Sequence, residues 1–183
     1  MPNLLLGVSG SISAYKSADI ISTLAKQNWQ ITAMMTKSST KFITPLTLQS
    51  LSKHFVYTDV MEEHHPDVIS HIELAKKADV FLIAPATANI IGKLANGIAD
   101  DMLTATALAL PNNLTPKLIA PAMNTNMYLH PAVQKNLEIL KEYGYHIIEP
   151  KESLLACGDY GKGALADIDT IAAKVNEQIQ RFI

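Results

Sequence analysis

The sequence has little of what a disulfide-rich or metal-clustered protein needs. Cys157 is its only cysteine, so an internal disulfide framework and any site with several cysteine ligands are excluded. Six histidines leave a site of histidines and carboxylates formally open. His64, His65 and His71 lack a recognised ligand spacing, however, and no metal is expected. His64 and His65 lie in a polar stretch and are interpreted as solvated.

The chain also lacks an excess of charge and a long apolar run. Lys plus Arg number 15 against 17 Asp plus Glu, and this balance excludes a basic nucleic-acid-binding or membrane-docking surface. Its longest apolar stretches, such as residues 80–84, fall well short of the roughly 20 residues that span a bilayer. No leader pattern opens the sequence, so we expect a soluble cytoplasmic protein with a reduced thiol.

The sequence is rich in aliphatic residues. Hydrophobic residues make up 48% of it and charged residues 17%, a balance that disfavours disorder. Four Phe, six Tyr and one Trp are too few to build a core, which must therefore be aliphatic. A length of 183 residues predicts a single domain over residues 1–183, large enough to bury a core without disulfides.

Short apolar runs alternate with helical patterns. Strands are predicted at residues 4–8, 31–35, 80–84, 117–120 and 145–148. Helices are predicted at residues 12–25, 44–51, 90–95, 100–110 and 133–143, and from 169 onward. Runs that are apolar on both faces, separated by helices, indicate a three-layer α/β/α domain of the Rossmann or flavodoxin-like type with a central parallel sheet. Residues 151–167 have three glycines and no clear period, which predicts a functional loop.

The predicted strand ends are rich in small and hydroxyl residues, at residues 7–13, 36–40, 84–89 and 120–124. Such ends let backbone N–H groups approach a phosphate beyond the carboxyl edge of a parallel sheet. The patterns G-x-G-x-x-G and G-x-x-x-x-G-K-[ST] are both absent, which disfavours NAD and ATP. A mononucleotide such as FMN remains as the candidate ligand.

Three residues could carry chemistry. By spacing alone His71 is a surface or helix-capping histidine, and Asn124 is a turn residue. Cys157 lies in a glycine-rich polar loop, where closure over a substrate is favoured over simple packing. Met123 and Met127 are by default packing residues, and the Asp100–Asp101 pair is interpreted as a helix start.

Five segments stand in a recognisable order: GVSGSISAYK at 7–16, HIEL at 71–74, APATAN at 84–89, PAMNTNM at 121–127 and ACGDYGKG at 156–163. Together they resemble the flavin-dependent cysteine decarboxylase family over nearly the whole chain. The resemblance implies FMN-dependent decarboxylation of 4′-phospho-N-pantothenoyl-L-cysteine to 4′-phosphopantetheine in coenzyme A biosynthesis, through thioaldehyde and ene-thiol intermediates.

The resemblance also implies roles for individual residues. Asn124 would hold the substrate carboxylate, His71 would act as base or orienter, and Cys157 would protonate the ene-thiol. The implied substrate contacts are Asn124, Met127, Ala156, Cys157 and Gly158. The implied FMN contacts are Ser9, Gly10, Ser11, Thr36, Ser38, Pro85, Ala86, Thr87, Asn89 and Ala122.

The resemblance also implies partners. Members of the family form a homotrimer, or an assembly of trimers, with the flavin near the contact between subunits. The chain is too short for a fused synthetase, so a separate phosphopantothenate–cysteine ligase would supply the substrate. The sequence departs from the family's pattern at Tyr128, where many members have Trp, and at Ala164–Leu165, where many have Arg-Met. Whether Lys16 or Lys162 contacts a substrate phosphate stays open.

Three alternative functions remain. A peptidyl-cysteine decarboxylase of lantibiotic maturation need not reduce its product, so the Cys157 loop disfavours it. A flavin prenyltransferase is disfavoured by the context of Asn124. A non-catalytic regulatory flavoprotein typically has acidic extensions or lacks part of the catalytic set, and this sequence shows neither feature.

Overall fold

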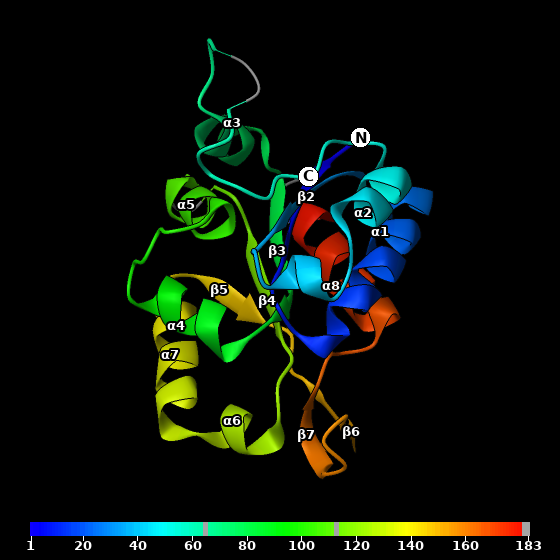
Figure 1. Cartoon of the computed structure of the whole chain (residues 1–183), viewed down its shortest axis with the longest axis vertical. Coiled ribbons are helices and arrows are strands. Elements are labelled where there is room, and N and C mark those ends of the chain that lie inside the picture. Colours follow the sequence, from blue (N-terminus) through cyan, green and yellow to red (C-terminus); the bar gives the residue numbers. More distant parts are fainter. Residues whose placement is uncertain (64–65, 112–113, 181–183) are drawn as a thin grey trace.

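A parallel sheet forms the centre of the molecule (Figure 1). The structure, a computed structural model, describes residues 1–63, 66–111 and 114–180. The five strands are paired in the order β2-β1-β3-β4-β5, and every pairing is parallel. They are β1 (Asn3–Val8), β2 (Gln30–Met35), β3 (Val80–Ala86), β4 (Lys117–Pro121) and β5 (Tyr145–Ile147). Each expected strand is present, which confirms the predicted fold class.

Helices cover both faces of this sheet. On one face lie α1 (Ser17–Lys26), α2 (Pro45–Ser52) and α8 (Ile168–Gln180). On the other lie α3 (Ser70–Lys77), α4 (Ala88–Ala95), α5 (Met102–Ala109), α6 (Thr125–Leu129) and α7 (Pro131–Glu142). This arrangement explains why the strands are largely apolar, since helices cover both faces of the sheet.

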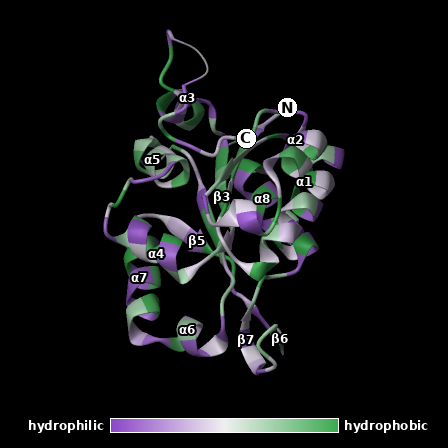
Figure 2. Cartoon of the chain, in the orientation of Figure 1, coloured by the Kyte–Doolittle hydropathy of each residue, from purple (hydrophilic) through white to green (hydrophobic). Residues whose placement is uncertain are grey.

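Alternation along β1 shows how one strand serves two cores. Leu4 and Leu6 are buried against the first helical layer, and Leu5 between them is buried against the second. β3 is buried at every position. In Figure 2, hydrophobic residues lie along β3, and the covering helices have both hydrophobic and hydrophilic stretches.

Several helix starts follow caps that the sequence contains. The Thr44 hydroxyl accepts a hydrogen bond from the Thr47 N–H, and Pro45 stands in the first turn of α2. Asp101 caps α5 and forms a reciprocal capping box with Thr104. The prediction that Asp101 begins a helix is therefore confirmed.

Four segments differ from expectation, and two of them are α3 and α6, which the sequence pattern did not predict as helices. The first predicted helix is divided into a 3₁₀ turn, η1 (Ile12–Lys16), and α1. The segment predicted as a loop contains an antiparallel hairpin of β6 (Lys151–Leu154) and β7 (Tyr160–Ala164). Much of this hairpin is exposed and it contains several glycines, so its sequence carries no clear apolar alternation.

The carboxyl ends of the parallel strands share one edge of the sheet, and the hairpin projects beyond that edge beside α6 (Figure 1). A further 3₁₀ turn, η2 (Ser39–Lys41), follows β2 there. Within the described ranges, no helix has the length and apolar character needed to cross a membrane.

Candidate functional site

A cavity of about 560 Å³ opens at the carboxyl edge of the sheet, between the strand ends and the hairpin. Its lining comes from four parts of the chain, which are the turn after β1, the start of α4, the segment after β4 and the hairpin. Of the residues predicted to contact FMN or substrate, eight line it: Gly10, Ser11, Thr87, Ala122, Asn124, Met127, Ala156 and Cys157.

Ser9 ties two of these strand ends together from beneath the cavity. Its hydroxyl donates to the Pro85 carbonyl at 2.7 Å and accepts from the Thr87 N–H at 3.0 Å. The side chain is 2% exposed, so it supports the site from inside the protein. As a result, the N-termini of η1, capped by Ser11, and of α4, capped by Thr87, lie at the same edge.

The end of β2 packs against the same turn. Gly10 approaches Ser38 so closely that a Cβ at Gly10 would lie 2.5 Å from the Ser38 Cβ. The Thr36 N–H donates to the Val8 carbonyl, and the Thr36 hydroxyl accepts from the Ser39 N–H. At the end of β4 the Ala122 N–H donates to the Ala86 carbonyl at 3.0 Å.

The structure therefore gathers the predicted cofactor residues at one edge in two groups. One group lines the cavity, and the other supports it or lies beside it: Ser9, Thr36, Ser38, Pro85, Ala86 and the exposed Asn89.

The donor set of this cavity suits a phosphorylated, flat-ringed ligand. Neither η1 nor α4 has an acidic residue in its first turn, and among the described residues no carboxylate lines the cavity, although Asp159 lies beside it on the Asn124 amide. Helix N-termini without a neighbouring carboxylate favour an anion. Lys16 lines the cavity and has no ion pair within the described part of the chain, whereas Lys151 is paired with Asp167. Ala88, Ala122 and Met123 supply apolar surface for a ring. The residues present thus fit FMN.

Asn124 lies at the centre of the second half of the site. Its side-chain oxygen accepts from the Asn126 N–H at 2.8 Å and so caps α6. The amide nitrogen consequently faces the hairpin, where Nδ2 lies 3.2 Å from Cys157 Sγ and 3.2 Å from Asp159 Oδ2. Because its oxygen is turned to the cap of α6, Asn124 presents its N–H groups on the side of the hairpin, and such donors can bind a carboxylate.

The hairpin is fixed to the segment after β4 through its backbone. The Met123 N–H donates to the Gly163 carbonyl at 2.9 Å. A Cβ at Gly163 would lie 2.2 Å from the Met123 carbonyl oxygen, and one at Gly161 would lie 2.6 Å from the Thr125 hydroxyl. Only glycine at these two positions lets β7 lie this close, and that closeness brings Cys157 to Asn124.

A second anchor of the hairpin is polar. Lys162 Nζ lies 2.7 Å from Glu149 Oε2, and the Tyr128 hydroxyl donates to the same oxygen at 2.9 Å. The hydrogen bond from Lys162, followed by that from Tyr128, holds the pKa of Glu149 below its ordinary value, although burial opposes them. Burial, and then the Glu149 carboxylate, raise the pKa of Tyr128. Lys162 is therefore engaged within the protein.

His71 lies elsewhere. It is the second residue of α3 and is not a cap, since Ile69 holds the N-cap position. α3 packs against α5, and Figure 1 shows α3 and the hairpin at opposite ends of the molecule. Within one chain the structure does not bring His71 to Asn124 and Cys157. Its Nδ1 is buried with no hydrogen-bond partner in the described part of the protein.

Other expectations have mixed outcomes. Met123 packs against the core, but Met127 is 49% exposed and lines the cavity. Leu165 is fully buried, and Ala164 lines the cavity with its short side chain. His64 and His65 lie outside the described residues. Among the residues that are described, no group of three His, Cys, Asp or Glu side chains is placed to hold a metal.

Sequence reasoning missed Asp159, which contacts both Asn124 and Cys157. The available signal was a carboxylate two residues after a thiol in a glycine-rich turn.

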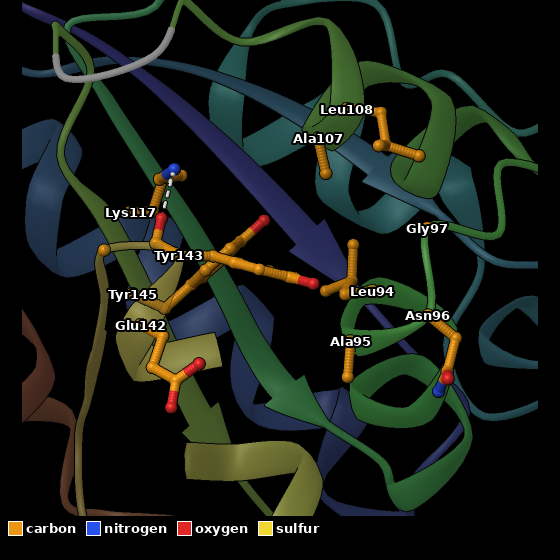
Figure 3. Close-up of a pocket in the computed structure, with 11 residues that line it drawn as sticks. Leu94, Ala95, Asn96, Gly97, Ala107, Leu108, Lys117, Glu142, Tyr143 and Tyr145 are labelled. Carbon is orange, nitrogen blue, oxygen red and sulfur yellow. Dashed lines mark hydrogen bonds between the residues drawn. The ribbon is translucent and has the colours of Figure 1, made fainter. Parts of the chain in front are cut away.

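A second cavity, of about 660 Å³, lies where β4 and β5 begin (Figure 3). Its lysine, Lys117, donates to the Tyr143 carbonyl at 2.7 Å at the end of α7 and lies 5.1 Å above the Tyr145 ring. Burial lowers the pKa of Lys117. Its ammonium is thus used at a helix C-terminus, and the cavity lacks the hydroxyl-rich strand ends of the first.

The chain is similar to known proteins along nearly its whole length. Residues 1–180 match the family model described as Flavoprotein. The chain is 55% identical over 176 residues to the probable phosphopantothenoylcysteine decarboxylase of Streptococcus mutans, covering 96% of this chain and 98% of that protein. It is 53% identical over 169 residues to the coenzyme A biosynthesis bifunctional protein CoaBC of Bacillus subtilis, covering 92% of this chain but 41% of that protein.

Two solved structures are also similar. One is a mutant PPC decarboxylase complexed with pantothenoylaminoethenethiol, with a TM-score of 0.88, 36% identity and 98% of each chain covered. The other is the FMN-dependent cysteine decarboxylase SpaF, with a TM-score of 0.84, 37% identity and 98% of each chain covered.

Proposed function

Because the chain belongs to the Flavoprotein family, we propose that it catalyses the FMN-dependent decarboxylation of 4′-phospho-N-pantothenoyl-L-cysteine to 4′-phosphopantetheine in coenzyme A biosynthesis. The observation that carries the proposal is the contact between Asn124 and Cys157 beside a cavity suited to a mononucleotide. A carboxylate-binding amide next to a thiol is what a reductive cysteine decarboxylase needs.

The cofactor is held by the strand-end turns. Gly10, Ser11 and Thr87, which line the cavity, would hold its phosphate and ribityl chain, and Ala122 would face the ring. Ser9, Thr36, Ser38, Pro85, Ala86 and Asn89 would support these turns from beneath or beside the cavity. Bound FMN supplies the oxidation of the substrate's thiol-bearing carbon to a thioaldehyde and later returns the two electrons. Lys16, which lines the cavity, would contact the phosphate of the substrate.

The remaining steps follow from the chain's own residues. Loss of CO2 from a cysteine carboxyl would leave an unstabilised carbanion, whereas a C=S group beta to the carboxylate accepts the released electrons and gives an ene-thiolate. Asn124 orients the carboxylate for this step through its N–H groups. Cys157 then protonates the ene-thiol as it is reduced. Met127 and Ala156, which line the cavity, enclose the substrate together with Gly158, the exposed neighbour of Cys157. Enclosure by the hairpin excludes water from the reacting atoms.

His71 completes the site from a second copy of the chain. It is remote from the cavity of its own chain, and its buried Nδ1 has no partner within the described residues. A homotrimer, or an assembly of trimers, with α3 of one copy at the cavity of the next would place His71 as base or orienter. The whole chain then acts as one domain that is functional only in the assembly.

Two further parts of the proposal concern the chain's surroundings. A separate ligase that joins cysteine to phosphopantothenate supplies the substrate. The relative CoaBC of Bacillus subtilis is named as bifunctional, and this chain spans 41% of its length. The location is cytoplasmic, where Cys157 stays a reduced thiol.

The test is to purify the protein, record its visible spectrum and incubate it with phosphopantothenoylcysteine under mass spectrometry. We expect a yellow protein that binds FMN and a product lighter by one CO2 at the oxidation level of a thiol. A peptide ending in cysteine is the parallel substrate. Turnover of that peptide alone would identify a peptidyl-cysteine decarboxylase, and a yellow protein that turns over neither substrate would identify a non-catalytic flavoprotein.

A further inference from the structure

Asp159 lies in the turn of the hairpin, next to both groups assigned to the reaction. Its Oδ2 accepts from Asn124 Nδ2 at 3.2 Å and from Cys157 Sγ at 3.4 Å. Because Nδ2 of Asn124 also lies 3.2 Å from Cys157 Sγ, the three side chains contact one another in a closed triangle.

The contacts of this triangle have a fixed direction. The Asn124 oxygen is used in the cap of α6, so its amide contributes only N–H donors. A carboxylate only accepts, so the thiol is the donor in its contact with Asp159. An isolated cysteine in an exposed turn has several rotamers open to it, and the Asp159 contact selects the one that brings Sγ to the amide.

Substrate binding would change two sides of the triangle. A substrate carboxylate that takes the N–H groups of Asn124 would displace both Asp159 and the Cys157 sulfur from that amide. Cys157 is then the remaining partner of Asp159 among the contacts seen here. The Asp159 carboxylate is thus free to hold the sulfur beside the substrate while the ene-thiol waits for its proton.

Resting on the proposed function, we propose that Asp159 is the positioning residue for the Cys157 thiol during the reductive half of the reaction. In that half the substrate carbon gains one proton from Cys157, the bound cofactor returns two electrons with a hydride, and the resulting thiolate regains its proton from water. Asp159 acts through Cys157 and takes no part in the loss of CO2.

The test measures two quantities in Asp159→Asn. The first is the release of CO2, and the second is the ratio of reduced thiol to oxidised ene-thiol. We expect CO2 to be released still, with a lower KM because Asp159 no longer competes for the Asn124 amide. The ratio of reduced to oxidised product should fall about tenfold to a hundredfold, since misplacing a reacting group by about 1 Å can cost about a hundredfold. Asp159→Glu, which keeps the carboxylate, recovers part of the ratio.

Asp167→Asn is the matched control. It removes the ion pair with Lys151 at the base of the hairpin and leaves the triangle intact. Loosening the hairpin lowers CO2 release and reduction together. If Asp159→Asn does the same, or leaves the ratio unchanged, the positioning role is wrong. A parent protein that releases no CO2 would instead overturn the proposed function itself.

Discussion

The amide nitrogen of Asn124 lies 3.2 Å from the sulfur of Cys157, although 33 residues separate them in sequence. One follows a buried strand and the other lies in the turn of an exposed hairpin. Their contact depends on two glycine positions that let β7 lie against the segment after β4. Each of the following predictions tests one part of this arrangement.

Asn124→Asp tests the donor role of the amide. Aspartate keeps an oxygen that can cap α6 but removes both N–H donors and adds a charge of the same sign as the substrate carboxylate. We expect kcat/KM to fall by about a hundredfold or more, since both a hydrogen bond to a charged group and charge complementarity are lost. Flavin absorbance and Tm should change little.

The matched control for that change is Asn126→Asp. It introduces the same charge two residues away, at an exposed position outside the cavity lining. Equal losses of kcat/KM in both variants would show that Asn124 matters only through local charge.

Cys157→Ser tests the proton donor. Serine is close in size but a far poorer acid than a thiol, so CO2 should still be released while the oxidised ene-thiol accumulates. A general acid contributes about 10²- to 10⁴-fold, so the rate of reduced product formation should fall by at least about a hundredfold. The two products differ in mass by two hydrogen atoms, so mass spectrometry distinguishes them. Normal yields of phosphopantetheine would exclude this role for Cys157.

Gly163→Ala tests the docking of the hairpin. The new Cβ would meet the Met123 carbonyl oxygen at 2.2 Å, so β7 must move away and lose the Met123 N–H contact. Such overpacking typically costs about 1–3 kcal/mol. We expect kcat/KM to fall and the hairpin to become a site of limited proteolysis. The circular dichroism spectrum should not change, because the sheet stays intact.

Gly92→Ala in α4 is the control for Gly163→Ala. Its new Cβ would approach only Asn136 Nδ2, at an ordinary 3.6 Å, and alanine favours the helix. We expect unchanged turnover and an equal or higher Tm. A hairpin that resists protease equally in both variants would contradict the docking argument.

Glu149→Gln tests the polar anchor through its pH dependence. Lys162 and Tyr128 lower the pKa of Glu149 in the folded protein, so this contribution to stability is complete above the unfolded-state pKa of about 4.3. It is lost as the pH falls through the lower, folded-state pKa. We expect Tm of the unsubstituted protein to fall more steeply below about pH 5 than that of the variant.

Glu138→Gln serves as the comparison for Glu149. Glu138 pairs with Lys141 on the surface of α7, a contact that does not involve the hairpin. Its removal should leave the acid limb of the Tm profile as it was. Identical profiles for the parent and Glu149→Gln would show that the anchor contributes nothing to stability.

Much of the fold was determined by the sequence alone. Runs apolar on both faces require a sheet covered on both sides, and Thr44, Asp101 and their neighbours mark helix starts through local hydrogen bonds. The small residues at the strand ends pointed to one ligand edge because parallel strands bring their carboxyl ends together. These are local or periodic properties that a linear sequence carries in full.

Tertiary structure decided the rest, because it depends on distances between segments remote in sequence. The hairpin is held mainly by its fit against residues 123–125 and by Glu149. Because its sequence has no apolar alternation, no periodicity indicated these two strands. The direction of the Asn124 amide was set by a cap, and Asp159 gained its place only through that orientation. His71, named by its motif, proved to lie away from the cavity of its own chain, because the packing of α3 against α5 determines where that histidine lies.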